Sequence, residues 1–106
     1  MPKYLITGSY TEHGAKGVIT EGGSGRVAAV TKLIASLGGT VESFYFGFGS
    51  DDFYVTVDLP GNTAAAAGTA VVAAAGGARP RTIVLLTPEE VDAAMQLSAD
   101  YRAPGA

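Results

Sequence analysis

Short stretches in which apolar and polar side chains alternate predict four β-strands in this chain. The stretches are residues 3–10, 40–48, 53–59 and 82–86. In the first of them Tyr4, Ile6 and Tyr10 would share one face, because successive side chains of a strand point to opposite sides. The second and third stretches are joined by a turn at 49–52 and therefore predict a β-hairpin.

Apolar residues three and four positions apart predict a helix over 25–37, with Ser24 as its N-cap. Its buried stripe would consist of Val27, Val30, Ile34 and Leu37. The preceding segment, 11–21, is ambiguous. Gly14 and Gly17 would each destabilise a helix there by about 1 kcal/mol relative to alanine.

Two further helices are predicted in the second half of the chain. Residues 64–75 are mostly alanine, and with Gly68 they would let another backbone come close. The sequence Thr87-Pro88-Glu89-Glu90 indicates the start of a terminal helix. Thr87 would cap it, Pro88 would take its first position, and Glu90 would complete a capping box.

The elements follow one another in the order βαββαβ, with the terminal helix after them. This order is typical of the ferredoxin-like α+β fold, an antiparallel sheet with two helices on one face. No internal repeat or low-complexity linker divides the chain, so we expect a single domain over residues 1–106.

Apolar residues occupy both faces of several predicted strands. In the last strand Ile83 and Leu85 point to one side, and Val84 and Leu86 to the other. Either the terminal helix crosses to the open face of the sheet or a second subunit covers it. One short helix is too small to cover a whole sheet. We therefore expect a dimer or a larger homo-oligomer, with a cavity between the two sheets.

Composition narrows the possible partners. Of 106 residues only 16% are charged, and the formal net charge of -3 excludes a strongly basic nucleic-acid binder. A hydrophobic fraction of 47% is that of a folded chain. No targeting segment and no run of about 20 apolar residues is present, so we expect a cytoplasmic protein without a membrane span. Cysteine is absent, which excludes disulfides and thiolate chemistry.

A series of short motifs runs in order from residue 2 to about residue 95. They are Pro2-Lys3-Tyr4-Leu5-Ile6, Gly8-Ser9-Tyr10-Thr11, Glu21-Gly22-Gly23-Ser24-Gly25-Arg26, Ser36-Leu37-Gly38-Gly39, Phe44-Tyr45-Phe46-Gly47-Phe48-Gly49, Asp58-Leu59-Pro60 and Leu86-Thr87-Pro88-Glu89-Glu90. With this series the chain resembles the GYD-domain family. The family's motif Gly-x-Tyr-Asp falls on residues 49–52, where Gly49 and Asp52 match and Asp51 replaces the tyrosine. The resemblance implies a dimeric ferredoxin-like α/β barrel and no established reaction.

Two residues are candidates for catalysis. His13, the one histidine, could be a general base or an axial haem ligand, or simply a surface residue. Asp52 could be an acid or base if it were buried, or it could cap a backbone N–H in the turn. Asp51 and Asp52 lack a third ligand nearby, so we expect no dedicated metal site. The sequence names no cofactor.

Four residues are candidates for binding a ligand. Ser24 and Arg26 lie in a glycine-rich segment that opens a helix, an arrangement suited to an anion or carboxylate, although the glycines could serve only to break and cap the helix. Tyr10 and Tyr45 could line an apolar cavity with their hydroxyls, or pack in the core. The function is then either a cofactor-independent enzyme acting on a small, partly aromatic molecule in the cavity between the subunits, or a non-catalytic binding or assembly module.

Overall fold

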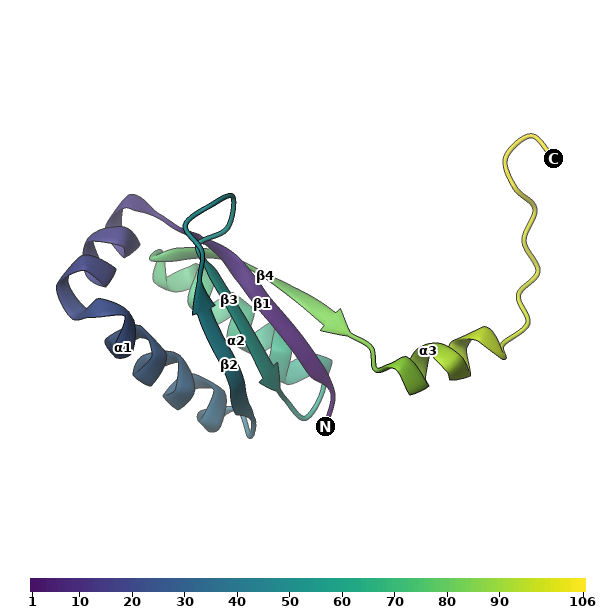
Figure 1. The fold of residues 1–106 in the computed structure, drawn as a ribbon, viewed down its shortest axis with the longest axis horizontal. Helices are drawn as coiled ribbons and strands as arrows, with labels where there is room; N and C mark the ends of the chain where they lie inside the picture. Colours follow the sequence, from purple (N-terminus) through teal and green to yellow (C-terminus); the bar gives the residue numbers. More distant parts are fainter.

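The computed structural model describes residues 1–106 and consists of one four-stranded sheet and three helices. The strands are β1 (Lys3–Tyr10), β2 (Thr40–Phe46), β3 (Phe53–Asp58) and β4 (Ala78–Leu85), and the helices are α1 (Glu12–Ser36), α2 (Asn62–Ala75) and α3 (Pro88–Met95). All strand pairs are antiparallel, in the spatial order β2-β3-β1-β4 (Figure 1). The predicted α+β, ferredoxin-like fold is confirmed.

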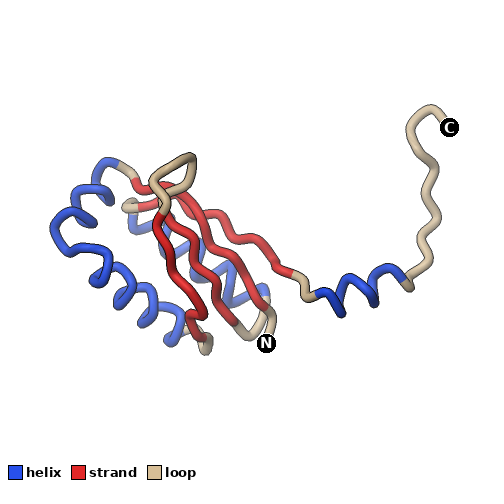
Figure 2. The backbone as a smooth tube through the Cα atoms, in the orientation of Figure 1, coloured by secondary structure: helices blue, strands red, loops and turns tan.

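Helices α1 and α2 cover one face of the sheet, as the tube drawing shows (Figure 2). The register aligns apolar residues on that face: Ile6 of β1 lies opposite Val55 of β3, and Tyr4 lies between Val57 and Val84. The buried core consists of Tyr4, Ile34, Phe53, Val55, Val57, Leu59 and Ala65. The alternation expected in β1 and β3 is therefore correct, and its apolar side faces the helices.

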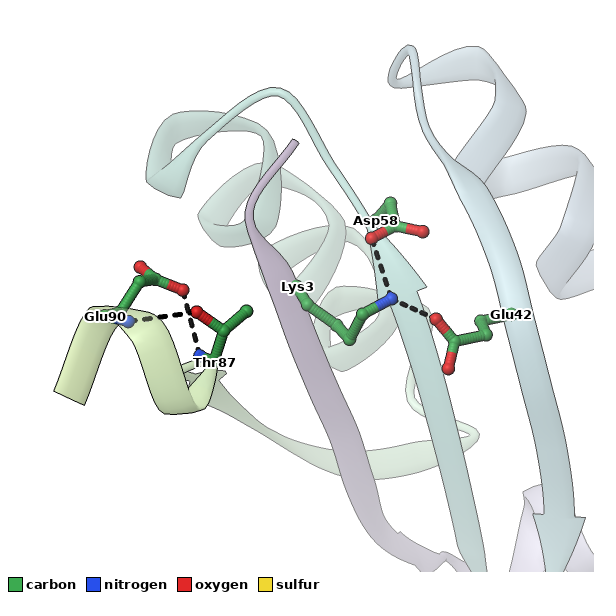
Figure 3. Close-up of polar contacts among 5 residues, drawn as sticks. All are labelled: Lys3, Glu42, Asp58, Thr87 and Glu90. Atoms are coloured by element: carbon green, nitrogen blue, oxygen red, sulfur yellow. Dashed lines mark hydrogen bonds and ion pairs between the residues drawn. The ribbon is translucent and has the colours of Figure 1, made fainter. Parts of the chain in front are cut away.

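The other face of the sheet is bare and chemically mixed. Lys3 of β1 forms ion pairs with Asp58 of β3 and with Glu42 of β2 (Figure 3). Apolar side chains lie beside this network: Tyr45 is 71% exposed and Ile83 is 43% exposed. No helix of the chain covers these residues. The sheet therefore has the uncovered face with apolar side chains that the sequence predicts.

Helix α1 starts much earlier than the predicted 25–37 boundary. Thr11, not Ser24, is the N-cap, and its side chain accepts a hydrogen bond from the N–H of Gly14. The helix is broken at Gly22, where φ is 78° and ψ is 170°. A φ of this sign strains residues with a Cβ, so glycine is needed there. The ambiguous segment is thus the first half of a kinked helix.

Strand β4 also starts earlier than predicted, at Ala78 instead of Thr82. Arg79 pairs with Ser9, and Pro80 pairs with Gly8, both on β1. Proline lacks an N–H donor, but β4 is an edge strand and tolerates it. The prediction failed because a proline between two arginines resembles a loop until its pairing partner is known.

Helix α3 forms as predicted but does not pack on the domain. The side chain of Thr87 and that of Glu90 each accept a hydrogen bond from the other residue's backbone N–H, which completes the capping box (Figure 3). The helix projects away from the sheet, and all its residues are exposed (Figure 1). It therefore leaves the bare face of the sheet uncovered.

None of the helices combines the length and apolar character needed to cross a membrane.

An ion pair ties the β2–β3 loop to β4. The guanidinium of Arg81 donates two hydrogen bonds to Asp51, of 3.0 Å and 2.7 Å. These bonds hold the pKa of Asp51 below its ordinary value, an effect that desolvation partly opposes. Asp51, which stands at the tyrosine position of the motif, thus has a structural partner on the edge strand.

This pair makes stability depend on pH in the acid range. The folded protein binds a proton at Asp51 less readily than the unfolded chain, whose aspartates titrate at about pH 3.9. The stabilisation is therefore present above that pH and is lost as the pH falls through the lower folded-state pKa. We expect wild type to exceed Asp51→Asn in unfolding free energy at about pH 7, and the difference to shrink at about pH 3.

Urea unfolding at the two pH values measures this difference. The control is Asp92→Asn, which removes an exposed carboxylate from α3 and should leave the acid dependence of wild type unchanged. A difference between wild type and Asp51→Asn that stays constant with pH would contradict the expectation.

Candidate functional site

An apolar cavity of about 90 Å³ lies between the sheet and the two helices that cover it. Its lining includes Ile6, Phe44 and Val55 from the sheet, Val30 and Leu33 from α1, and Ala65, Gly68 and Val72 from α2. The side of α2 that faces the sheet carries small residues, and both Ala65 and Gly68 are buried. Such side chains do not reach across to α1, so a space remains between the helices.

This cavity adjoins an open polar cleft of about 540 Å³, a volume within the range of about 300–1,000 Å³ common for ligand sites. The cleft lies between the first half of α1 and the end of α2. His13, Lys16, Thr20 and Glu21 line it from α1, and Ala75 and Gly77 from the other side. Tyr10, Arg26, Val72 and Ala78 line both spaces. The apolar cavity therefore adjoins the polar cleft at these residues.

The position of the cleft is fixed by the start of α1. The N–H of Thr11 donates to the carbonyl of Gly77 at 3.0 Å, and its hydroxyl donates to the carbonyl of Gly76 at 2.8 Å. Gly14 lies so close to Gly77 that a Cβ would come within 1.8 Å of the Gly77 carbonyl oxygen. The first turn of α1 is thus held against the end of α2, and any side chain at position 14 would separate them.

Arg26 is the charged residue at the boundary between cavity and cleft. Its Nη1 donates to the carboxylate of Glu21 at 2.9 Å, so the anion that this arginine binds is a residue of the same helix. Its Nε–H is buried and has no hydrogen-bond acceptor. Buried donors are almost always paired in folded proteins. An acceptor that enters from the cavity or the cleft would satisfy this N–H.

Tyr10 lies beside Arg26 and is partly buried. Its ring packs against Phe53, with the ring centroids 5.1 Å apart. Burial raises the pKa of Tyr10, and the nearby Arg26 guanidinium only partly reverses the shift. A tyrosine hydroxyl is protonated at neutral pH in any case, so it can donate a hydrogen bond.

Asp52 lines neither the cavity nor the cleft. Its Oδ2 accepts a hydrogen bond of 2.8 Å from the backbone N–H of Tyr10, and its own N–H donates to the Gly8 carbonyl at 2.7 Å. Backbone capping is one of the two roles that the sequence leaves open for this residue. Asp52 thus fixes the end of β1 and, with it, the position of Tyr10.

The structure brings together only part of the set predicted from sequence. His13, Tyr10 and Arg26 line one cleft. Ser24 is exposed on α1 just after the break and lines no cavity, while Tyr45 lies on the opposite, bare face of the sheet. One chain therefore cannot place Tyr45 and Tyr10 in the same pocket.

Sequence reasoning missed three polar residues of the cleft: Lys16, Thr20 and Glu21. His13, Lys16 and Thr20 are spaced three and four apart, which places them on one face of a helix. That signal was present but could be used only once segment 11–21 was known to be helical.

The chain was compared with models of known protein families, with curated proteins and with solved structures. The sequence model of the GYD domain matches residues 4–95, which is most of the chain and includes all three helices and, except for Lys3 of β1, all four strands. The protein therefore belongs to the GYD-domain family. Neither a curated protein nor a solved structure gave a match.

The role of Asp52 can be tested by replacing it. Asp52→Ala removes a hydrogen bond to a charged acceptor and leaves the Tyr10 N–H unpaired, so we expect it to lower the unfolding free energy by about 1–3 kcal/mol. Asp52→Asn keeps an acceptor oxygen and should lose less. Urea unfolding of both variants measures the effect. An Asp52→Ala variant that is as stable as wild type would show that this hydrogen bond has no structural role.

Proposed function

We propose that this GYD-domain protein binds a small, partly apolar molecule on the helix side of its sheet. The apolar part of the molecule would enter the cavity, and its polar end would lie in the cleft near Tyr10, His13 and Arg26. Ligand sites are typically concave and mostly apolar, with a few polar groups that fix orientation. The observation that carries the proposal is the shared lining: Tyr10 and Arg26 border both spaces.

The same arrangement supports a cofactor-independent proton transfer as the catalytic form of this function. His13 lines the cleft and not the apolar cavity, so it would face the polar end of the ligand. An imidazole is the side chain best suited to exchange protons near neutral pH. In this form of the proposal Asp52 is a positioning residue that acts through Tyr10.

We also propose that two chains pair through the bare face of the sheet. Tyr45 and Tyr54 are cross-strand neighbours on that face, and both are exposed. Ile83 on β4 is exposed on the same face. Pairing two such sheets would bury these side chains and would leave the helix-side cavity of each chain free. The ligand sites would then lie outside the subunit interface.

Blocking the boundary between cavity and cleft should abolish ligand binding. Val72→Phe places a large ring where the two spaces meet. In a thermal-shift screen of metabolites, a ligand at 100 times its Kd should stabilise wild type by about 2.7 kcal/mol. We expect no shift for Val72→Phe with the same ligand.

The matched control for this variant is its neighbour on α2. Val71→Phe introduces the same ring at a position that is 57% exposed and lines no cavity. It should respond to the ligand like wild type. Equal responses of the two variants would contradict a site between the helices.

Pairing through the sheet can be measured by light scattering. We expect about 21 kDa for wild type, twice the 10.7 kDa of one chain. Tyr45→Glu places a charge in the proposed interface and should shift the mass toward one chain. Ile19→Glu changes an 84%-exposed apolar residue on α1 and should leave the dimer intact. A wild type of about 11 kDa at micromolar concentration would refute the pairing.

A further inference from the structure

We infer that the ligand presents a neutral carbonyl oxygen to Arg26 and Tyr10. This inference rests on the proposed function and adds the chemical class of the ligand. Its evidence is the hydrogen bonding and the charge balance around one side chain, the guanidinium of Arg26.

Arg26 and Tyr10 each place a hydrogen-bond donor where the cavity adjoins the cleft. The Nε–H of Arg26 is buried without an acceptor, and Arg26 borders the apolar cavity as well as the cleft. The protonated hydroxyl of Tyr10 lies beside the guanidinium. Two donors next to each other at the end of an apolar cavity suit an oxygen atom that accepts hydrogen bonds.

Both cations of the cleft already have an anionic partner within the chain. The positive charge of Arg26 is already balanced by Glu21, whose carboxylate oxygen lies 2.9 Å from Nη1. Lys16, the other cation of the cleft, is paired with Glu12 at 3.4 Å. A ligand carboxylate at Nε would set a second anion close to Glu21 in a partly buried site, where like charges repel strongly.

A neutral acceptor avoids this repulsion. The oxygen of a ketone, aldehyde or amide can accept from Nε and from the Tyr10 hydroxyl while Glu21 keeps its bond to Nη1. The cavity behind these donors has a volume of about 90 Å³ and apolar walls, so it suits a small hydrocarbon group. The ligand class that fits is therefore a small carbonyl compound with an apolar body.

Three probes of similar shape test the inference: acetophenone, ethylbenzene and benzoate. They share an aromatic ring and differ in the group next to it, which is a neutral carbonyl, a hydrocarbon or a carboxylate. In wild type we expect acetophenone to bind about tenfold more tightly than ethylbenzene, because one hydrogen bond to a charged donor is made. Benzoate should bind less tightly than acetophenone.

A direct readout does not depend on any variant folding. The Nε–H resonance of Arg26 in a ¹H–¹⁵N spectrum should shift when acetophenone is added and should stay in place with ethylbenzene. Arg26→Lys assigns that resonance and retains a cation for Glu21. The variant should bind acetophenone with only a small preference over ethylbenzene, because the Nε donor is gone and the Tyr10 hydroxyl alone faces the carbonyl oxygen.

Glu21→Gln tests the charge argument. Removing the carboxylate leaves the charge of Arg26 unbalanced, so the preference should move toward benzoate by about tenfold. Asp92→Asn is the control: it removes one negative charge from the exposed helix α3, which does not line the cleft. It should leave the order of the three probes unchanged.

The outcomes separate this inference from the proposed function. Equal binding of acetophenone and ethylbenzene to wild type, or tighter binding of benzoate, would overturn the carbonyl ligand and leave an apolar-ligand site standing. Failure of all three probes to bind wild type would overturn the site itself, and the carbonyl inference with it.

Discussion

The break in α1 at Gly22 is the constraint on which the candidate site depends. Before the break, the helix is held to the end of α2 by hydrogen bonds from Thr11 to Gly76 and Gly77. After it, Ile34 anchors the helix in the core. Between these two attachments the helix is kinked at Gly22. The kink also places Glu21 and Arg26 on either side of the break, where their ion pair spans it. The cation of the site is thus positioned by a backbone geometry that only glycine adopts readily.

The small residues of α2 have a complementary effect. Protein interiors are usually filled to high density, and a larger side chain in place of Ala65 would fill part of the space next to α1. The core of this domain instead lies close to the strands, around Val55 and Val57. Because α2 is rich in alanine, it buries less apolar surface than larger side chains would. The space that remains is the cavity that adjoins the cleft at Tyr10 and Arg26.

The two acidic residues at the position of the family motif attach the β2–β3 loop to neighbouring strands. Asp51 stands where the GYD motif has tyrosine, and it binds Arg81 on the edge strand through two hydrogen bonds. The neighbouring Asp52, which matches the motif, binds the backbone of Tyr10. The loop between β2 and β3 is thus attached to both β1 and β4. Its acidic residues support the site from outside and do not line it.

The sequence alone determined the order of the elements, the two faces of β1 and β3, and the start of α3, because each depends on local periodicity or on a capping box within a few residues. The beginnings of α1 and β4 depended on tertiary contacts: Thr11 with Gly77, and Pro80 with Gly8. Tertiary contacts also decided which residues line the candidate site. His13, Tyr10 and Arg26 line one cleft because hydrogen bonds from Thr11 hold the first turn of α1 against the end of α2, while the register of β2 places Tyr45 on the opposite face. Local patterns specify which way a side chain points within its own element. Only the packing of elements distant in sequence decides which side chains meet.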